Sequence, residues 1–340
     1  MRLPALLACG VSLAALAATA GCGVFGNDEP ADLQIYSARH YGAEEVFAAF
    51  TEDTGLTVDF LAGDDAELLQ RIEAEGAESP ADVYMTVDAG NLWNAAQRGV
   101  LAEVASPALE QAVPRQYRGA QGHWFGLVLR ARTVIYNPDN VSPDEFDAED
   151  TYAGLTDPKW DGRLCMRGTT GVYTASLVAS LIDLHGRDRA LEIVEGWVAN
   201  DVKVESNDVL LIDAVDAGTC DVALINHYYL ARELADRPDL DVELYWASQE
   251  GAGVHVNISG AGVVETSDNP DAARELLEWL ATDGQDELIA GNEEFPVNGD
   301  VPPEPISGAF GPFEPMPIDA EAYGARNAEA IDLLAEAGYE

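Results

Sequence analysis

Three short segments rich in tyrosine each follow a stretch that the sequence pattern predicts to be a β-strand. They are Tyr36–Tyr41 (Tyr-Ser-Ala-Arg-His-Tyr), Thr169–Tyr173 and Asn226–Tyr229. In open α/β sheets, ligands bind beyond the carboxyl ends of the strands, so we expect these segments to face one cleft. The second and third segments also lie near predicted helix N-termini, where the helix dipole favours an anion. Their positions therefore point to a ligand site built from phenol groups.

The chemistry of a phenol restricts the ligand that such a site would take. Tyrosine has a pKa of about 10, so only a hard, strongly charged cation displaces its proton at neutral pH. Ferric iron fits, and tyrosinate ligates ferric iron in other proteins. Four phenolates around Fe³⁺ leave a small net negative charge, which is acceptable in a tight, dry site. The candidate ligands are Tyr41, Tyr173, Tyr228, Tyr229 and, as a fifth, His40.

Most tyrosines in a chain of this size serve other purposes. The chain has twelve, and a single tyrosine is more often a core or cleft residue than a ligand. Tyr36, Tyr84 and Tyr136 alternate within predicted strands, so we expect them in the core. His227 precedes the tyrosine pair and is expected at the surface. Only the combination of tyrosines at three strand ends supports a metal site.

The elements that would position these residues follow an α/β pattern. From Asp32 onward, short strands alternate with amphipathic helices, which is typical of a mostly parallel sheet covered by helices. Val128–Asn137 and Gly253–Val264 are long extended segments with a separate run of strands and helices between them. We therefore expect a bilobal α/β fold whose two extended crossovers act as hinges around a cleft. Asn292–Pro317, with seven prolines, is expected to be a surface loop. The predicted lobes are residues 32–129 plus 262–340, and residues 130–261.

The first 21 residues have the features of an export signal. Arg2 is followed by the apolar run Leu6–Ala18 and by small residues that lead to Cys22. Thr19–Cys22 is similar to a bacterial lipobox, in which the cysteine carries a lipid; an ordinary signal peptide with a chance cysteine is the alternative. The apolar run is shorter than the roughly 20 residues of a membrane span. We expect residues 22–31 to be a tether that holds a secreted protein at the outer face of the cytoplasmic membrane.

The remaining cysteines predict a disulfide. Cys9 leaves with the signal and Cys22 is assigned to the lipid, so Cys165 and Cys220 are left. In an oxidising compartment an isolated pair of this kind is more often a disulfide than a metal site. A thiolate metal site would need more sulfur or a histidine pattern nearby.

Charge and motif content exclude other classes of function. The net charge is −43, with acidic residues spread along the whole chain, which indicates a solvated surface and argues against nucleic-acid binding. The five histidines lack the spacing of a zinc site, and no Gly-x-Ser-x-Gly motif or phosphate loop is present. The sequence therefore does not predict an enzyme.

The chain resembles the bacterial periplasmic ferric-ion-binding proteins of iron ABC transporters, most closely the cyanobacterial subgroup. The resemblance covers residues 32 to 338. It depends on the Tyr-Ser-Ala-Arg-His-Tyr stretch ending at Tyr41, on Val172-Tyr173 and on Asn226–Tyr229. Further similarity lies in Lys159–Arg163, Ser176–Ser180, Asn257–Gly262 and Asn292–Val297.

This resemblance implies a set of ligands and partners. The iron ligands would be Tyr41, Tyr173, Tyr228, Tyr229 and His40, with ferric iron as the transported ion and ferrous iron also compatible. Five candidate ligands make an obligatory anion less needed; if a carbonate-like anion does complete the site, it would bind at Thr169, Thr170 and the backbone before Tyr173. The partners would be the permease and ATPase of an ABC transporter, with the binding protein acting as a monomer.

The competing interpretation is a binding protein of the same fold for a small organic cation or anion, such as a polyamine, thiamine or a phosphonate. Aromatic side chains would then form a cage around the ligand or stack on it. That site would need tryptophans and acidic groups that converge. Trp124, Trp160, Trp197 and Trp246 are instead scattered along the sequence, and packing accounts for each of them.

Overall fold

The structure, a computed structural model, describes residues 30–39, 41–169 and 172–339. The predicted export signal and Cys22 lie outside these residues, as do His40, Thr170 and Gly171. The chain from Ala31 onward folds as one unit. In its described part, no helix is both long and apolar enough to cross a membrane.

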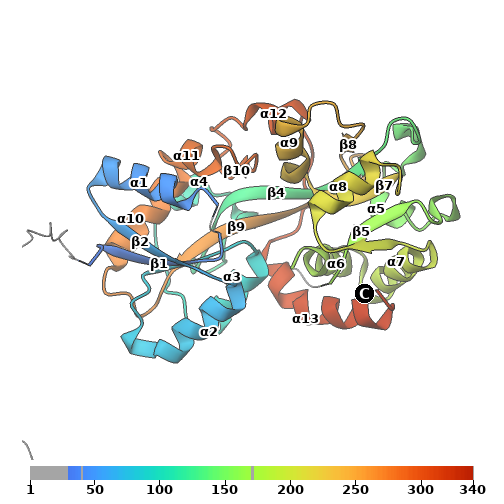
Figure 1. Cartoon of the computed structure of the whole chain (residues 1–340). Coiled ribbons are helices and arrows are strands. Elements are labelled where there is room, and N and C mark those ends of the chain that lie inside the picture. The colour runs from blue at the N-terminus through green and yellow to red at the C-terminus, as the bar shows by residue number, and fades with distance from the viewer. Residues whose placement is uncertain (1–29, 40, 170–171, 340) are drawn as a thin grey trace, which may run out of the picture. The chain divides into compact units, whose positions relative to one another are not determined.

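The strands of the described residues form one mixed sheet (Figure 1). Along its main path the order is β2-β1-β3-β9-β4-β7-β5-β6, and β8 and β10 pair with β4. Strands toward both ends of this path pair in parallel, whereas β4 and β9 are antiparallel to their neighbours. The strands are β1 (Leu33–Ser37), β2 (Val58–Ala62), β3 (Val83–Thr86), β4 (Phe125–Tyr136), β5 (Leu164–Arg167), β6 (Lys203–Glu205), β7 (Val222–Asn226), β8 (Glu243–Tyr245), β9 (His255–Val263) and β10 (Phe295–Pro296).

Two long strands, β4 and β9, carry the chain between the two ends of the sheet. They pair with each other over Phe125–Arg132 and His255–Ala261. The far end of β9 pairs with β3, and the far end of β4 pairs with β7. Gly260 is needed where they approach, because a Cβ there would collide with the carbonyl oxygen of Phe125. The two strands are the extended crossovers of the predicted bilobal α/β fold, which is confirmed.

Helices lie on both sides of the strands, and one of them spans the two lobes. The C-terminal helix α13 packs against both α3 and α6, and Figure 1 shows it running beneath the crossovers. The helices are α1 (Ala43–Thr54), α2 (Asp65–Glu75), α3 (Ala89–Gln97), α4 (Pro107–Ala112), α5 (Thr151–Gly154), α6 (Val172–His185), α7 (Arg187–Ala199), α8 (Asp208–Asp216), α9 (His227–Asp236), α10 (Pro270–Ala281), α11 (Gln285–Ile289), α12 (Pro305–Ala309) and α13 (Glu321–Glu336).

The local signals for these elements are clear in the sequence. Helix α1 buries Val46, Phe47 and Phe50 on one face, as their helical spacing predicts, and ends at Gly55 in the left-handed conformation. Helix α2 begins after Asp64, whose carboxylate accepts hydrogen bonds from the first turn. Tyr36, Tyr84 and Tyr136 are buried within strands as predicted.

The predicted disulfide between Cys165 and Cys220 is present. Their Cα atoms lie 5.8 Å apart, with Cys165 in β5 and Cys220 just before β7. The bond therefore joins the two strands that lead into α6 and α9.

The proline-rich stretch Asn292–Pro317 differs in part from the predicted surface loop. Its residues 295–296 form β10, which pairs with β4, and residues 305–309 form α12, which packs against α9. Glu294 is completely buried. The prediction failed because these prolines lie at positions where helices and strands accept proline. Pro305 is the first residue of α12, and Pro296 ends a two-residue strand.

Candidate metal centre

The four candidate tyrosines lie at the carboxyl ends of three strands, as predicted. Tyr41 follows β1 and lies two residues before the start of α1 at Ala43. Tyr173 is the second residue of α6, after β5. Tyr228 and Tyr229 are the second and third residues of α9, which begins directly after β7. The parallel strands β5 and β7 lead to Tyr173, Tyr228 and Tyr229, whereas β1 runs antiparallel to them and brings Tyr41 from the opposite side. The first three tyrosines lie in the first turn of α6 or α9, where the helix dipole favours an anion.

The structure brings the four phenols into one cluster. The hydroxyl oxygens of Tyr173 and Tyr228 are 3.4 Å apart, and the ring centres of Tyr228 and Tyr229 are 4.4 Å apart. Tyr41 comes from the other lobe, and the guanidinium of Arg232 lies between it and Tyr228, at 5.0 and 4.8 Å from the two ring centres. His40, the fifth candidate, is outside the described residues.

Burial favours the protonated form of Tyr41, Tyr173 and Tyr228 in the absence of a cation. It raises the pKa of Tyr41, and the carboxylate of Glu294 raises it further. The pKa of Tyr228 is raised by burial first and then by the nearby phenols Tyr173, Tyr229 and Tyr41. Burial also raises the pKa of Tyr173, although Arg130 opposes the shift. A ligand that takes phenolates must therefore displace several protons.

Arginines surround the tyrosine cluster. The chain has only 18 basic residues against 61 acidic ones, so a group of arginines at one place is a local reversal of charge. Arg167 and Arg130 lie 4.6 and 5.1 Å from the ring centre of Tyr173, and Arg39 lies 4.6 Å from that of Tyr41. The positive charges of these arginines would reduce the electrostatic repulsion between neighbouring phenolates and so favour loss of the phenol protons. The group consists of Arg39, Arg130, Arg132, Arg167 and Arg232.

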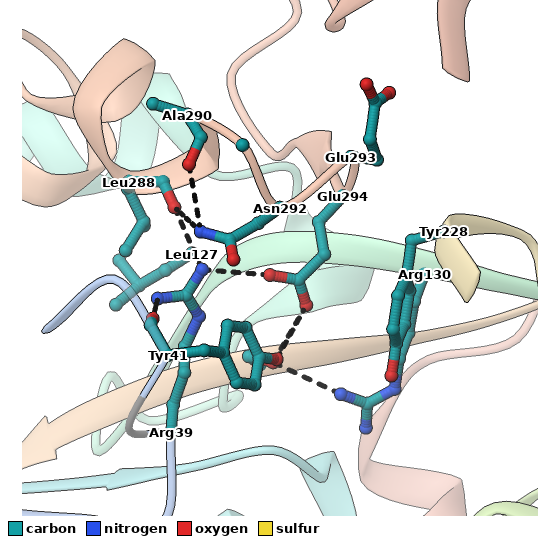
Figure 2. A network of polar contacts seen from close by, with 12 residues as sticks. Arg39, Tyr41, Leu127, Arg130, Tyr228, Leu288, Ala290, Asn292, Glu293 and Glu294 are labelled. Carbon is teal, nitrogen blue, oxygen red and sulfur yellow. Dashed lines mark hydrogen bonds and ion pairs between the residues drawn. The ribbon is translucent and has the colours of Figure 1, made fainter. Parts of the chain in front are cut away.

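Two buried carboxylates hold part of this arginine group in place. Glu294, on the segment after α11, accepts a hydrogen bond from Arg39 at 2.9 Å (Figure 2). Asp208, the first residue of α8, accepts from both Arg132 at 3.0 Å and Arg167 at 2.6 Å. Both carboxylates are fully buried, so the ion pairs are shielded from solvent.

Several buried donors beside the tyrosines have no acceptor among the described residues. Arg130 is 1% exposed; its Nη1 donates to Ser259 at 3.1 Å, but Nε and Nη2 have no partner there. Nδ2 of the buried Asn226 also has no acceptor among the described residues. An unmet buried donor costs about 1–3 kcal/mol, so these groups indicate a place for an anionic ligand.

These donors were missed by the sequence analysis, which placed the anion at Thr169 and Thr170. Thr169 is exposed, and Thr170 lies outside the described residues. One signal was available: Arg130 and Arg132 interrupt an otherwise apolar extended segment, where a charged residue needs a partner.

His227 is not at the surface as expected, but fully buried. Its Nδ1 accepts from the backbone N–H of Ala131 at 3.1 Å, and its Nε2 donates to the carbonyl oxygen of Glu293 at 3.0 Å. Burial lowers the pKa of His227 to about 3, so the ring is neutral. The prediction failed because the first residue of α9 turns toward β4 and the segment after α11, whose backbone supplies both partners.

Histidine, cysteine and carboxylate side chains do not form a metal site of their own in the part of the chain that the structure describes. No three of them gather in positions that could hold a metal ion. Trp124, Trp160 and Trp197 are fully buried, in agreement with the packing role expected for them.

The fold is that of a two-lobed binding protein. The chain belongs to the family of bacterial extracellular solute-binding proteins, whose family model matches residues 37–287. This family is defined by binding rather than by catalysis, in agreement with the prediction that the protein is not an enzyme.

Relatives of known sequence and structure agree with this assignment. The chain is 38% identical to iron uptake protein A1 of Synechocystis, over 92% of this chain and 88% of that protein. It is 31% identical to the major ferric iron-binding protein of Neisseria gonorrhoeae, over 80% and 82%. Among solved structures, a Trichodesmium protein (IdiA, FutA) in complex with iron and citrate is similar with a TM-score of 0.86 and 38% identity, over 91% of this chain and 99% of that one.

Proposed function

We propose that this protein captures ferric iron between its two lobes and delivers it to an ABC transporter. The observation that carries the proposal is the convergence of four phenols, Tyr41 from one lobe and Tyr173, Tyr228 and Tyr229 from the other. Tyr228 is buried and the other three are half-buried. The names of its relatives, an iron uptake protein and ferric iron-binding proteins, support iron as the cargo.

The physical argument for ferric iron depends on the protons that must leave. The pKa values of Tyr41, Tyr173 and Tyr228 are raised, so a weakly polarising ion would not displace their protons. A trivalent hard cation can, and the surrounding arginines would balance the net negative charge that four phenolates leave around it. We propose His40 as a fifth ligand.

A small anion fits the same site. We propose that a carbonate-like or carboxylate anion accepts hydrogen bonds from Nε and Nη2 of Arg130 and from Nδ2 of Asn226, which have no acceptor in the described residues. The similar Trichodesmium structure holds citrate together with iron, which supports an anion next to the metal.

The arginine group also bears on the alternative ligands. A polyamine or thiamine would meet five cations, so the organic-cation alternative is disfavoured. A phosphonate would suit the arginines, and it remains the second candidate. Such an anion would bind without displacing phenol protons and would give no colour.

The cellular setting is proposed from the sequence. We propose that the chain is exported, lipidated on Cys22 and tethered by residues 22–31 as a monomer at the outer face of the cytoplasmic membrane. Residues 32–129 with 262–340 would form lobe one and residues 130–261 lobe two. The permease and ATPase of the transporter would receive the iron.

Addition of ferric citrate to the purified protein tests the proposed function. We expect a visible phenolate-to-iron charge-transfer band that saturates at about one iron per chain, as one four-phenol site implies. Tyr228→Phe combined with Tyr229→Phe should abolish the band, because it removes half of the phenolates.

The matched control removes two phenols from elsewhere. Tyr36→Phe combined with Tyr136→Phe changes buried tyrosines whose hydroxyls donate to Glu75 and Glu243, which are not part of the cluster, and should keep the band. A colourless wild-type protein that binds no iron would overturn the proposal.

A further inference from the structure

Three consecutive residues, Asn292–Glu294, contact the tyrosine-bearing segments of both lobes. Figure 2 shows their contacts with Arg39 and Tyr41. The carbonyl oxygen of Asn292 accepts from Arg232 of α9 at 2.9 Å, and that of Glu293 accepts from His227 at the start of α9. The carboxylate of Glu294 points the other way, toward Arg39 and Tyr41. One short segment thus connects the Tyr41 side of the cluster to the helix that carries Tyr228 and Tyr229.

The backbone of this segment is held in an unusual conformation. Glu293 has a φ of 59°, in the left-handed region that non-glycine residues rarely adopt. Its carboxylate accepts from the backbone N–H and the hydroxyl of Ser307, both at 2.8 Å, and its own N–H donates to Glu304 at 2.7 Å. Because these contacts fix the left-handed backbone conformation of Glu293, they direct the side chain of Glu294 toward Arg39 and Tyr41.

Glu294 holds Tyr41 directly and through Arg39. Its Oε1 accepts from the hydroxyl of Tyr41 at 3.3 Å and from Ser259 at 3.4 Å, while Oε2 pairs with Arg39 at 2.9 Å. Arg39 in turn donates to the carbonyl oxygen of Tyr41 at 3.3 Å and to that of Leu288 at 2.8 Å. Its guanidinium also lies against the ring of Tyr41. The backbone, ring and hydroxyl of Tyr41 therefore all connect to one buried carboxylate.

We propose that Glu294 is a positioning residue, which fixes Tyr41 for metal binding from outside the ligand set. This inference rests on the proposed function. Tyr41 is the one tyrosine of the cluster that comes from lobe one and lies between a strand and a helix, so no helical turn constrains it. A partner that orients a ligand typically contributes 10–100-fold to metal affinity.

A double-mutant cycle tests this role with the full mature chain and ferric citrate. Glu294→Gln keeps the shape of the side chain but removes the charge that holds Arg39. We expect its iron affinity to fall by about 10–100-fold, with faster iron release. Tyr41→Phe should weaken binding as well, and Glu294→Gln should add little in the Tyr41→Phe background, because its effect passes through Tyr41. If Glu294 had a purely structural role, the losses of iron affinity caused by Glu294→Gln and Tyr41→Phe would add up in the double variant.

Two further variants make the test decisive. Glu294→Asp keeps the charge that Arg39 needs but shortens the reach to Tyr41, and it should weaken iron binding in the same direction. Glu243→Gln, which alters a carboxylate 2.6 Å from the hydroxyl of Tyr136 outside the cluster, should leave affinity unchanged.

The outcomes separate this inference from the proposed function. If wild-type protein binds iron and both Glu294 variants bind it equally well, the positioning role is wrong and the function stands. Additive losses in the cycle, or failure of both Glu294 variants to fold, would make Glu294 a structural residue and also overturn the role. A wild-type protein that binds no iron overturns both proposals.

Discussion

At the scale of single residues, the site brings together phenols and arginines whose proximity is energetically unfavourable without a bound ligand. Burial and then the neighbouring phenols raise the pKa of Tyr228, and several nitrogens of the arginines around them have no acceptor among the described residues. A trivalent cation and an anion would resolve both problems at once, since the cation takes the phenolates and the anion takes the unpaired donors.

The protonation of the phenols predicts how iron binding depends on pH. Tyr41, Tyr173 and Tyr228 have raised pKa values, so they are protonated in the free protein across the neutral range. Each phenol that binds iron releases a proton, and lower pH opposes this release. Iron affinity, measured by competition with citrate and corrected for the citrate equilibria, should therefore rise with pH. A pH-independent affinity between pH 6 and 8, roughly the range where phenols stay protonated, would contradict phenolate ligation.

At the scale of elements, much of the fold could be predicted because its signals are local. The helical spacing of Val46, Phe47 and Phe50 predicted α1, and the apolar extended segments predicted β4 and β9. The tyrosines could be located because each follows a strand. The short β10 and α12 could not be predicted, because a two-residue strand and a five-residue helix are stabilised mainly by their contacts with β4 and α9.

The surroundings of the tyrosines were harder to predict for the same reason. Arg39 and Glu294 are 255 residues apart in sequence, and Arg132 and Asp208 are 76 apart. No local spacing connects such residues; only the folded chain brings them together. The burial of His227 is the clearest example of a feature that sequence cannot predict, because its hydrogen-bond partners are backbone groups that a sequence pattern does not reveal.

The disulfide gives a prediction about the strands that carry the site. Cys165 and Cys220 close a loop of 55 residues, for which loop entropy predicts a contribution of about 4 kcal/mol to the free energy of unfolding. Cys165→Ala combined with Cys220→Ala should lower stability in urea denaturation by about this amount. An unchanged unfolding midpoint would contradict a stabilising role for the bond.

At the scale of the whole molecule, the crossovers β4 and β9 allow two lobes to share one ligand. They pair with each other in the middle and with strands of a different lobe at each end, so motion at this point would separate Tyr41 from the other phenols. The segment Asn292–Glu294 and α13 are further links, because each contacts elements from the two lobes.

The most direct measurement is the anomalous scattering of iron in crystals of the iron-loaded mature protein. The account predicts one strong peak per chain, bound by the phenol oxygens of the four tyrosines at about 2 Å, with the lobes closed around it. The ligands in question are Tyr41, Tyr173, Tyr228 and Tyr229. An iron peak elsewhere in the molecule, or one bound by tyrosines of a single lobe with Tyr41 turned away, would contradict it.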